Sequence, residues 1–579
     1  MTQDQTRQGQ HELASVRRRS RGLFWATGVF SVCVNLLMLT GPLFMLQVYD
    51  RVLGSGSEAT LVALFVIVAF LYLMMGLLDG IRGRILSRIA ARFQSDLETR
   101  VFHAAMSRAA RKPRDKSQSR AMDNLAALRR FFGSPAFSAL YDLPFTPVFL
   151  FGIGLFHPYL GMLAVGGGAV LVALALLHRA IAKPAQGAAL QSETEAAQMA
   201  SRMTTAAEAL QALGMQEAAY RRWMRARGAA LARSVTSEDT THGFTAASRA
   251  LRLFLQSAML ALGAWLVLQK DVSSGAMIAS SILLGRALQP IDILIGQWNL
   301  VQHAQRAWAD LSELLGAYPP LPERTELPRP KAALTVQNLT IVPPGQTQAS
   351  LRSISFDLLP GEALGVIGPS GAGKSTLARA LTGVWPPNTG SLRLDGAKLS
   401  HYAPEVLGSY IGYLPQQVQL FDGTIAENIA KLALSPDAEA VVLAAQKADA
   451  HNLILSLPEG YDTQVASAGG LLSGGQLQRI GLARAFYGNP VIVILDEPNS
   501  NLDNDGSLAL NAAIRRHKAE GGAVLIMAHR PSAIQECEKL LVLDGGLRRA
   551  FGPRDAVLTE MVKNSKDILR KNAGQGGIQ

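Results

Sequence analysis

The sequence predicts a multi-domain membrane protein, in which an all-α domain of six transmembrane helices precedes a soluble α/β domain. Hydrophobic residues make up 49% of the 579 residues and charged residues 17%, against roughly 25% charged residues in a typical soluble domain. The net charge of +12 is also unevenly placed. Residues 1–320 hold 32 Lys and Arg against 20 Asp and Glu, whereas residues 321–579 hold 24 of each. These values indicate a basic membrane part followed by a soluble part.

Six apolar stretches predict the transmembrane helices, since each is long enough to cross the hydrocarbon core of a bilayer, which takes roughly 20 residues. They are residues 23–48, 60–81, 134–156, 158–181, 247–268 and 273–294. Between Arg82 and Arg130 the chain carries 13 basic and four acidic residues. By the positive-inside rule this loop lies in the cytoplasm together with the N-terminus, and six spans return the chain to that side. Because the basic residues flank apolar stretches, we expect membrane lipids and no nucleic acid as partners.

The remaining segments complete the predicted domain organisation. Residues 1–22 end in a run of arginines, which we interpret as a cytoplasmic anchor beside anionic headgroups; a disordered basic tail is compatible with the same residues. The apolar stretch that follows is too long for a signal peptide and lacks a small-residue cleavage site. We expect a transmembrane domain at 23–316, a proline-rich linker at 317–333, an α/β domain at 334–560 and a flexible tail at 561–579.

Four charged residues lie within or beside the predicted spans: Asp79, Asp142, Arg286 and Asp292. Charges inside a membrane mark either a transport pathway or a paired group, but near the ends of spans they equally well reach the interface, and the sequence leaves both readings open. Cys33 and Cys537 are the only cysteines and lie far apart. Their spacing suits neither a disulfide framework nor a zinc site.

A phosphate-binding loop is predicted after the apolar run 363–367, where a glycine-rich turn leads into a helical pattern. Glycines let successive N–H groups face inward, and the helix N-terminus adds a partial positive charge. We expect Lys374 to reach the phosphates of ATP and Ser375 to bind Mg²⁺. A turn that only joins a strand to a helix is the alternative. The predicted loop consists of Gly368, Pro369, Ser370, Gly371, Ala372, Gly373, Lys374, Ser375 and Thr376.

Two further patterns predict ATP hydrolysis. The run 491–495 reads as a buried strand and ends in Asp496 and Glu497, of which we expect the first to hold Mg²⁺ and the second to polarise the attacking water. Between this strand and the loop stands Leu472 followed by Ser473, Gly474, Gly475 and Gln476, just before a helical run. Alone, such a turn would be a helix cap.

In this order the motifs resemble those of ABC transporter ATPases, for which the pentapeptide at 472–476 is the specific signature. The resemblance implies a homodimer in which each ATP lies between the P-loop of one subunit and the signature of the other. It implies that Gln416 senses Mg²⁺ and the γ-phosphate, that His529 contacts the γ-phosphate and that Asp503 belongs to a loop that communicates across the dimer. The sequence departs from the family in two places. Pro343 stands where an aromatic ring usually stacks on adenine, and Ser467 stands where exporters often carry a glutamate.

A narrower resemblance concerns type I secretion ATPases of the protease-exporter branch. It rests on residues 45–52, on residues 212–215 with Arg222 and Trp223, and on residues 496–503. It implies export of a protein with an uncleaved C-terminal signal, with a periplasmic adaptor and an outer-membrane channel as partners, from the inner membrane of a Gram-negative bacterium. The 22 residues before the first span leave no room for a peptidase domain.

Two rival functions share some of these features. A lipid or small-molecule exporter has the same architecture and predicts ATPase stimulation by lipids or drugs without adaptor proteins. A soluble ATP-driven machine with a buried helical domain would release from membranes in alkaline carbonate, although six long apolar stretches argue against it.

Overall fold

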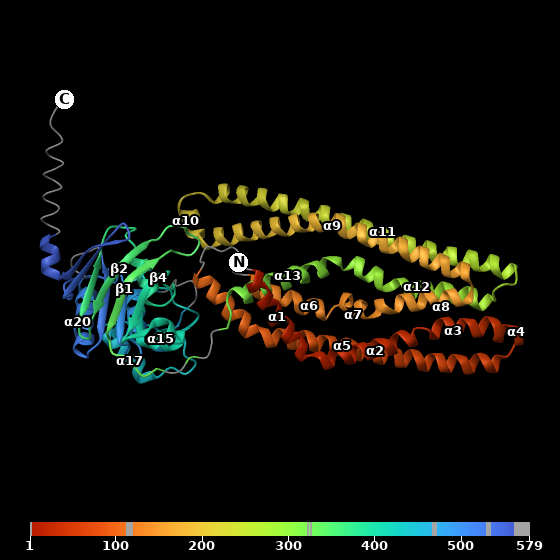
Figure 1. Cartoon of the computed structure of the whole chain (residues 1–579), viewed down its shortest axis with the longest axis horizontal. Helices are drawn as coiled ribbons and strands as arrows, with labels where there is room; N and C mark the ends of the chain where they lie inside the picture. The colour runs from red at the N-terminus through yellow and green to blue at the C-terminus, as the bar shows by residue number, and fades with distance from the viewer. Residues whose placement is uncertain are drawn as a thin grey trace, which may run out of the picture. The chain divides into compact units, whose positions relative to one another are not determined.

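We describe a computed structural model of the chain, which covers residues 3–111, 120–320, 324, 327–465, 472–528 and 534–560 (Figure 1). The chain divides into two compact units, Met1–Ala109 with Arg114–Pro320 and Ala110–Pro113 with Leu321–Gln579. Each unit is described by itself.

The first unit is helical throughout its described residues, apart from short connections. A π-helical turn, η1 (Val48–Val52), and a 3₁₀ turn, η2 (Leu143–Phe145), interrupt two of the spans. The α-helices are α1 (Gln3–Arg19), α2 (Arg21–Leu37), α3 (Thr40–Gln47), α4 (Leu53–Ser55), α5 (Glu58–Arg111), α6 (Arg120–Phe132), α7 (Pro135–Asp142), α8 (Thr146–Phe156), α9 (Pro158–Thr205), α10 (Ala207–Ala212), α11 (Gln216–Leu268), α12 (Ser274–Gly296) and α13 (Trp298–Ala317).

The predicted membrane domain is confirmed, since the described residues contain six helical segments that are long and apolar enough to cross a membrane. These segments are Arg21–Ser55, Glu58–Arg111, Pro135–Phe156, Pro158–Thr205, Gln216–Leu268 and Ser274–Gly296. Three of them continue well past the apolar stretch, because α5, α9 and α11 contain 54, 48 and 53 residues. At 1.5 Å per residue each is about 70–80 Å long. Helices α9 and α11 pack side by side (Figure 1).

The N-terminal segment, predicted as a cytoplasmic anchor with a disordered tail as the alternative, forms the helix α1 and packs against α13. Leu13 and Val16 are buried, and Glu12 forms an ion pair with Arg100 of α5 at 2.8 Å. The two helices approach so closely at Gly9 and Gly316 that an added Cβ would lie within 2 Å of a backbone oxygen of the other helix. The apolar face of α1 consists of few residues within a polar sequence, so the amino-acid composition of the segment does not indicate a packed helix.

The charged residues of the spans are largely paired. Arg82 is buried, and its guanidinium binds Asp79 and Asp142 at 2.7 Å each. Asn35 donates a hydrogen bond to the same Asp142 oxygen at 2.8 Å, so that three spans meet at this cluster. Asp292 of α12 pairs with Arg252 of α11 at 2.5 Å. These contacts identify the charges as polar links between helices.

Asp50, in the run 45–52 that carries the narrower resemblance, caps the N-terminus of α12. One carboxylate oxygen accepts a hydrogen bond from the backbone N–H of Gly275 at 2.9 Å, and the other accepts one from the hydroxyl of Ser273 at 2.6 Å. A carboxylate at a helix N-terminus satisfies otherwise unpaired N–H groups and complements the helix dipole. The π-helical turn η1, which contains Asp50, therefore joins the first span to the last.

The second unit combines α-helices with two main sheets and a small two-stranded one. Its helices are α14 (Lys374–Leu381), α15 (Pro404–Tyr410), α16 (Ile425–Ile429), α17 (Ala438–Lys447), α18 (His451–Leu455), α19 (Gly474–Phe486) and α20 (Asn504–Ala519), with 3₁₀ turns η3 (Leu399–His401) and η4 (Gly460–Asp462). Its strands are β1 (Leu334–Ile341), β2 (Leu351–Leu358), β3 (Ala363–Ile367), β4 (Thr389–Leu394), β5 (Ala397–Lys398), β6 (Ile411–Leu414), β7 (Gly423–Thr424), β8 (Gln464–Val465), β9 (Ile492–Asp496), β10 (Ala523–Ala528), β11 (Lys539–Asp544) and β12 (Leu547–Pro553).

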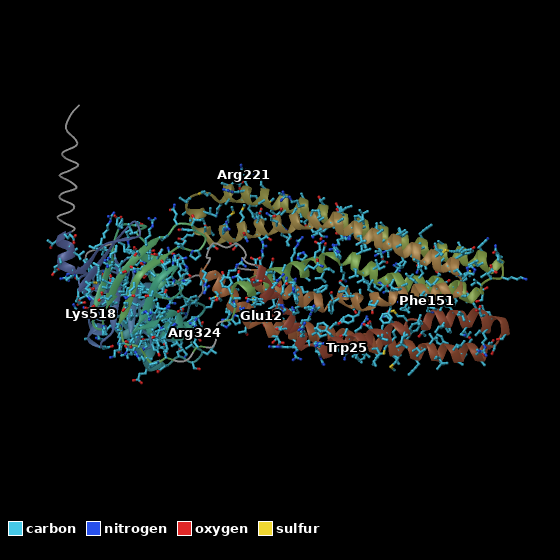
Figure 2. The ribbon with its side chains drawn as sticks, in the orientation of Figure 1. Glu12, Trp25, Phe151, Arg221, Arg324 and Lys518 are labelled. Carbon is cyan, nitrogen blue, oxygen red and sulfur yellow. The ribbon has the colours of Figure 1, made fainter. Side chains whose placement is uncertain are left out.

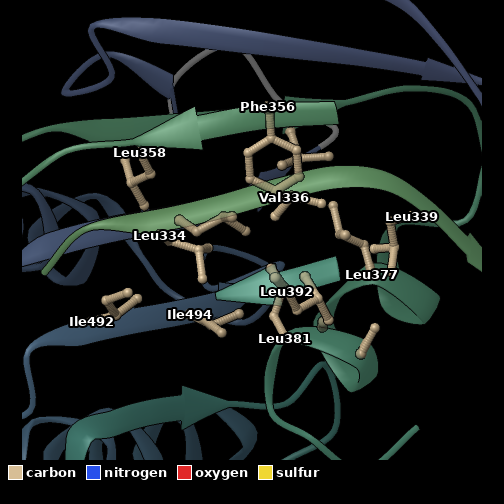
Figure 3. Packing of buried hydrophobic residues seen from close by; sticks show 14 of the residues in the cluster. Leu334, Val336, Leu339, Phe356, Leu358, Leu377, Leu381, Leu392, Ile492 and Ile494 are labelled. Atoms are coloured by element: carbon tan, nitrogen blue, oxygen red, sulfur yellow. The ribbon is translucent and has the colours of Figure 1, made fainter. Parts of the chain in front are cut away.

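The sheets pack through one apolar core. Four strands form the antiparallel order β2-β1-β4-β5, and six form the order β12-β11-β3-β10-β9-β6, in which all neighbours except β12 and β11 are parallel. Helix α14 supplies Leu377 and Leu381 to the core between the sheets, as Figure 3 shows. Burial of both faces explains why strands such as β9 are continuous apolar runs. The predicted fold class is confirmed for both units.

Candidate nucleotide-binding site

The candidate site is built where four adjacent parallel strands end. Strands β3, β10, β9 and β6 are neighbours in the sheet, so their carboxyl ends lie along one edge. The predicted loop follows β3, Asp496 and Glu497 stand at the end of β9, and Gln416 follows β6. Ligands of open α/β sheets bind at this edge. The strand order thus brings together residues that lie far apart in the sequence.

The loop at 368–376 has the backbone that its glycines predict. Gly371 and Gly373 adopt φ values of +80° and +101°, in the left-handed region that favours glycine. Gly373 directly precedes α14, and an added Cβ there would lie 2.6 Å from the side chain of Leu351. Because the first N–H groups of a helix lack intrahelical acceptors, the start of α14 can donate hydrogen bonds to phosphate oxygens.

Lys374 is the cation of this loop. Its side chain is buried, and the ammonium donates hydrogen bonds to the backbone oxygens of Gly368 at 2.8 Å and Pro369 at 3.1 Å. Burial lowers the pKa of Lys374, while the charges of Glu497 and Asp496 act in the opposite direction. The ammonium is therefore held at the loop by oxygen atoms that a phosphate can replace.

Asp496 is suited to bind a divalent cation. The residue is 2% exposed, and its Oδ1 has no hydrogen-bond donor among the described residues, whereas its carboxylate accepts a hydrogen bond from Ser375. Burial raises the pKa of Asp496, the hydrogen bond from Ser375 lowers it, and the neighbouring Glu497 raises it. A buried carboxylate oxygen without a donor beside a hydroxyl fits Mg²⁺, which prefers oxygen ligands.

Glu497 stands in a strained backbone position next to this oxygen. Its φ is +55°, a value that is uncommon for a residue other than glycine, and its N–H donates to the backbone oxygen of Met527 at 2.9 Å. The amide of Gln416 donates to the Glu497 carboxylate at 3.0 Å. Strain of this kind concentrates at functional sites, where the surrounding structure fixes an unfavourable conformation.

Two predicted residues lie outside the described part of the chain. His529 directly follows β10, the strand between those that carry the loop and Glu497, but its own placement is not described. Ser467 likewise falls in the undescribed stretch 466–471. Pro343, the other departure from the family, is described and is buried after β1.

The signature turn forms a complete capping box. The hydroxyl of Ser473 accepts a hydrogen bond from the backbone N–H of Gln476, and the Gln476 side chain accepts one from the backbone N–H of Ser473 at 2.8 Å. An added Cβ at Gly475 would lie 2.9 Å from the backbone oxygen of Asn501. The box fixes the first turn of α19, whose remaining N–H groups are available to an anion.

Sequence reasoning missed the contacts that attach this turn to the loop after β9. Gln478 donates a hydrogen bond to the backbone oxygen of Pro498 at 3.1 Å. Arg479 bridges Asp503 at 3.2 Å and Asp449 at 3.1 Å, and Asp503 itself caps α20. The hydrogen bond from Gly506 is the largest effect that lowers the pKa of Asp503. The adjacency of Gln478 and Arg479 to the signature was the available sequence signal.

A six-span helical unit and a P-loop unit with a separate helix-capping signature together define a membrane transporter driven by ATP hydrolysis, of the ABC class. Comparison with known proteins supports the assignment to this class. The family description "ABC transporter transmembrane region" matches residues 24–290, and "ABC transporter" matches residues 351–500. The chain belongs to the ABC transporter family, and its ATPase domain couples ATP hydrolysis to transport.

Individual relatives extend this finding over most of the chain. The chain is 40% identical to the type I secretion system ATP-binding protein PrsD of Rhizobium meliloti (strain 1021), over 97% of this chain and 96% of the relative. It is 29% identical to the leukotoxin export ATP-binding protein LtxB of Aggregatibacter actinomycetemcomitans, over 91% of this chain and 75% of that protein. A solved bacterial Atm1-family ABC exporter with ATP bound shares the fold, with a TM-score of 0.81 at 23% identity, over 93% of this chain and 97% of that chain.

Proposed function

We propose that the chain is the ATP-driven exporter of a type I secretion system, and that two copies move a protein substrate with a C-terminal secretion signal out of the cytoplasm. The observation that carries this proposal is the 40% identity to a type I secretion ATP-binding protein over nearly the whole of both chains. A second relative is named for leukotoxin export, which is also transport of a protein. Both units needed for ATP-driven transport are present in the chain.

In the proposed reaction, Glu497 polarises the water that attacks the γ-phosphate of ATP. The hydrogen bond from Gln416 holds its carboxylate, and the hydrogen bond from its own N–H to Met527 fixes its backbone. Lys374 exchanges the backbone oxygens of the loop for phosphate oxygens and stabilises their charge. His529, next along the chain after β10, contacts the γ-phosphate in this proposal.

Mg²⁺ would be held by Asp496, Ser375 and Gln416, and it would neutralise charge on the phosphates. The buried Asp496 oxygen without a donor supports this ligand set. Gly368 to Thr376 would surround the phosphates of one ATP.

The signature of the partner subunit would complete each site in a homodimer. Ser473, Gly474, Gly475 and Gln476 present the start of α19 in a conformation that the capping box already fixes. The contacts from Gln478 and Arg479 connect that turn to the loop that directly follows Glu497. Closure of two subunits around ATP would therefore be transmitted through this loop to the carboxylate of Glu497.

The cytoplasmic loops near residues 115–130 and 205–220 would carry this closure to the spans. The second loop contains α10 and ends in a tight turn at Gly214, where φ is +65°. On either side of the glycine, Leu213 is 70% exposed and Met215 is 47% exposed. Exposed apolar side chains at a loop tip are suited to docking. Residues 112–119 of the first loop lie outside the described part of the chain.

We further propose the inner membrane of a Gram-negative bacterium as the location, with a periplasmic adaptor and an outer-membrane channel as partners. The positive-inside distribution of the loops supports a cytoplasmic ATPase domain. The domain boundaries at 22, 316, 333 and 560 remain proposals of the same kind.

The test compares the secreted proteins of wild-type cells, cells without the gene and cells complemented with Glu497→Gln. We expect the same protein to disappear from the medium of the last two strains. Purified transporter should then show ATPase stimulation by the C-terminal segment of that protein and not by the same peptide with its residues scrambled. An unchanged set of secreted proteins, together with ATPase stimulation by lipids or drugs, would replace this proposal by the small-molecule exporter.

A further inference from the structure

The first unit contains a cavity of about 650 Å³ where α1, α2, α6 and α7 meet. Three arginines and five aromatic residues line it. The arginines are Arg17, Arg18 and Arg21, which stand at the end of α1 and the start of α2. A cavity with cationic and aromatic walls and no acidic lining residue is selective for an anion that also carries apolar groups.

The cavity lies where the first span begins. The apolar segment starts at Arg21, and Trp25, one turn further along α2, is 74% exposed (Figure 2). Trp and Tyr side chains gather at the membrane interface, and arginines on the cytoplasmic side face anionic headgroups. A bilayer around the first span would have the arginines at headgroup level and the exposed Trp25 beside the acyl chains.

Three of the aromatic residues that line the cavity, Phe24, Phe132 and Phe137, pack against one another and form an aromatic wall. The ring of Phe24 meets those of Phe132 and Phe137 edge to face at centroid distances of 6.3 and 6.2 Å, and the latter two rings are 5.2 Å apart. Edge-to-face contacts of this kind are favourable and directional. The wall joins α2 to α6 and α7, so the shape of the cavity is set by helix packing.

The arginines differ in their contacts. Arg17 lies over the ring of Trp308 of α13, with 5.9 Å from its guanidinium carbon to the ring centroid. Arg18 and Arg21 are exposed, and within the described residues neither forms an ion pair. The acid nearest along α1, Glu12, is engaged with Arg100. Two of the guanidinium groups that line the cavity therefore have no acidic ion-pair partner in the part of the chain that the structure describes.

We propose that this cavity binds the phosphate headgroup of an anionic phospholipid, with Arg18 and Arg21 on the phosphate and Trp25 against the acyl chains. A guanidinium binds phosphate through paired, charge-assisted hydrogen bonds. The position at the start of an apolar span favours a lipid over a soluble anion. The proposal rests on the membrane domain alone, so its test does not depend on which substrate is exported.

The experiment uses the full-length protein in detergent, with native mass spectrometry to follow binding of phosphatidylglycerol and phosphatidylcholine. We expect R18Q/R21Q to weaken phosphatidylglycerol binding on the order of 20-fold, because each arginine near a membrane contributes roughly a fivefold factor. The matched control is R84Q/R88Q, which removes two exposed arginines of α5 that do not line the cavity. This control should bind within about threefold of wild type, and unchanged ATPase activity would show that both variants fold.

Further measurements separate a lipid site from simpler explanations. Trp25→Ala should weaken phosphatidylglycerol binding severalfold and leave the R18Q/R21Q effect in place. Inorganic phosphate at millimolar concentration should not displace the lipid. Equal losses in R18Q/R21Q and R84Q/R88Q would reduce the effect to general surface charge and overturn the proposal. Displacement by inorganic phosphate would overturn it in favour of a soluble anion, and an inert Trp25→Ala would remove the cavity from the explanation.

Discussion

Replacement of Arg82 by Met tests whether the polar cluster between the spans holds the membrane domain together. The Arg82 side chain is 8% exposed and that of Asp142 is 13% exposed, and their closest atoms are 2.7 Å apart. Removing one partner of a buried ion pair typically costs about 3–5 kcal/mol, because the other charge stays buried. Asn35 still donates to Asp142 in the variant, and Asp79 is half exposed, so we expect a loss near the lower limit, about 3 kcal/mol.

The assay is thermal unfolding of the purified full-length protein in detergent, followed by tryptophan fluorescence. For a long chain each kcal/mol corresponds to roughly 2 °C, so Arg82→Met should lower the apparent Tm by about 6 °C. Arg84→Met is the matched control, since Arg84 is an exposed arginine on the same helix, and it should shift the Tm by less than about 1 °C.

A double variant distinguishes the ion pair from packing by the arginine stem. In R82M/D142N both charges of the buried Arg82–Asp142 pair are gone, while the half-exposed Asp79 stays hydrated, and neutral replacement of a buried pair often changes stability little. We therefore expect the double variant to recover most of the Tm lost in R82M. Equal Tm values for R82M and R84M would contradict the reasoning. A double variant whose loss of Tm equals the sum of the losses in R82M and D142N would contradict it as well.

Three further predictions concern the second unit. Glu497→Gln should lower ATP turnover by on the order of 10²–10⁴ while nucleotide affinity stays within a few-fold, as rate and binding measurements on the same sample would show; normal turnover would exclude the proposed role. Lys374→Ala should weaken ATP binding about 10- to 100-fold in equilibrium titration, because a charge-assisted contact is lost, and unchanged affinity would contradict this. Burial lowers the pKa of His517 to about 4. Since the folded pKa lies below the ordinary value of about 6.5, the unfolded chain takes up the proton first, and stability present above pH 6.5 is lost as the pH falls toward 4, by about 3 kcal/mol. His517→Phe should flatten this loss in pH-dependent melting, and an equally steep loss would refute the assignment.

The sequence sufficed for features that depend on local patterns. Six apolar runs predicted the spans because a bilayer sets a minimum length, and the glycine spacing at 368–373 predicted the loop because only certain backbones surround a phosphate. The sequence also predicted that Asp496 and Glu497 act together with the loop, and the strand order brings them to one sheet edge, because β3 and β9 are parallel strands separated by β10.

Contacts between distant residues were beyond such reasoning. Arg82 and Asp142 are 60 positions apart, and nothing in their neighbours indicates that α5 and α7 meet there. The cap that Asp50 makes on α12 spans 225 positions to Gly275. The packing of α1 against α13 was not predicted, because these contacts use glycine and two aliphatic side chains, which hardly alter a polar composition.

The uninterrupted length of α5 has a mechanical consequence. From Arg82 to Arg111 the helix continues for 30 residues beyond its apolar stretch, an arm of about 45 Å. As a lever pivoting at the membrane surface, this arm would convert a tilt of about 5° into a displacement of about 4 Å at its far end. The cluster at Arg82 lies where this arm begins, so in such a motion a small rearrangement of two carboxylates and one guanidinium would become a larger displacement at Arg111.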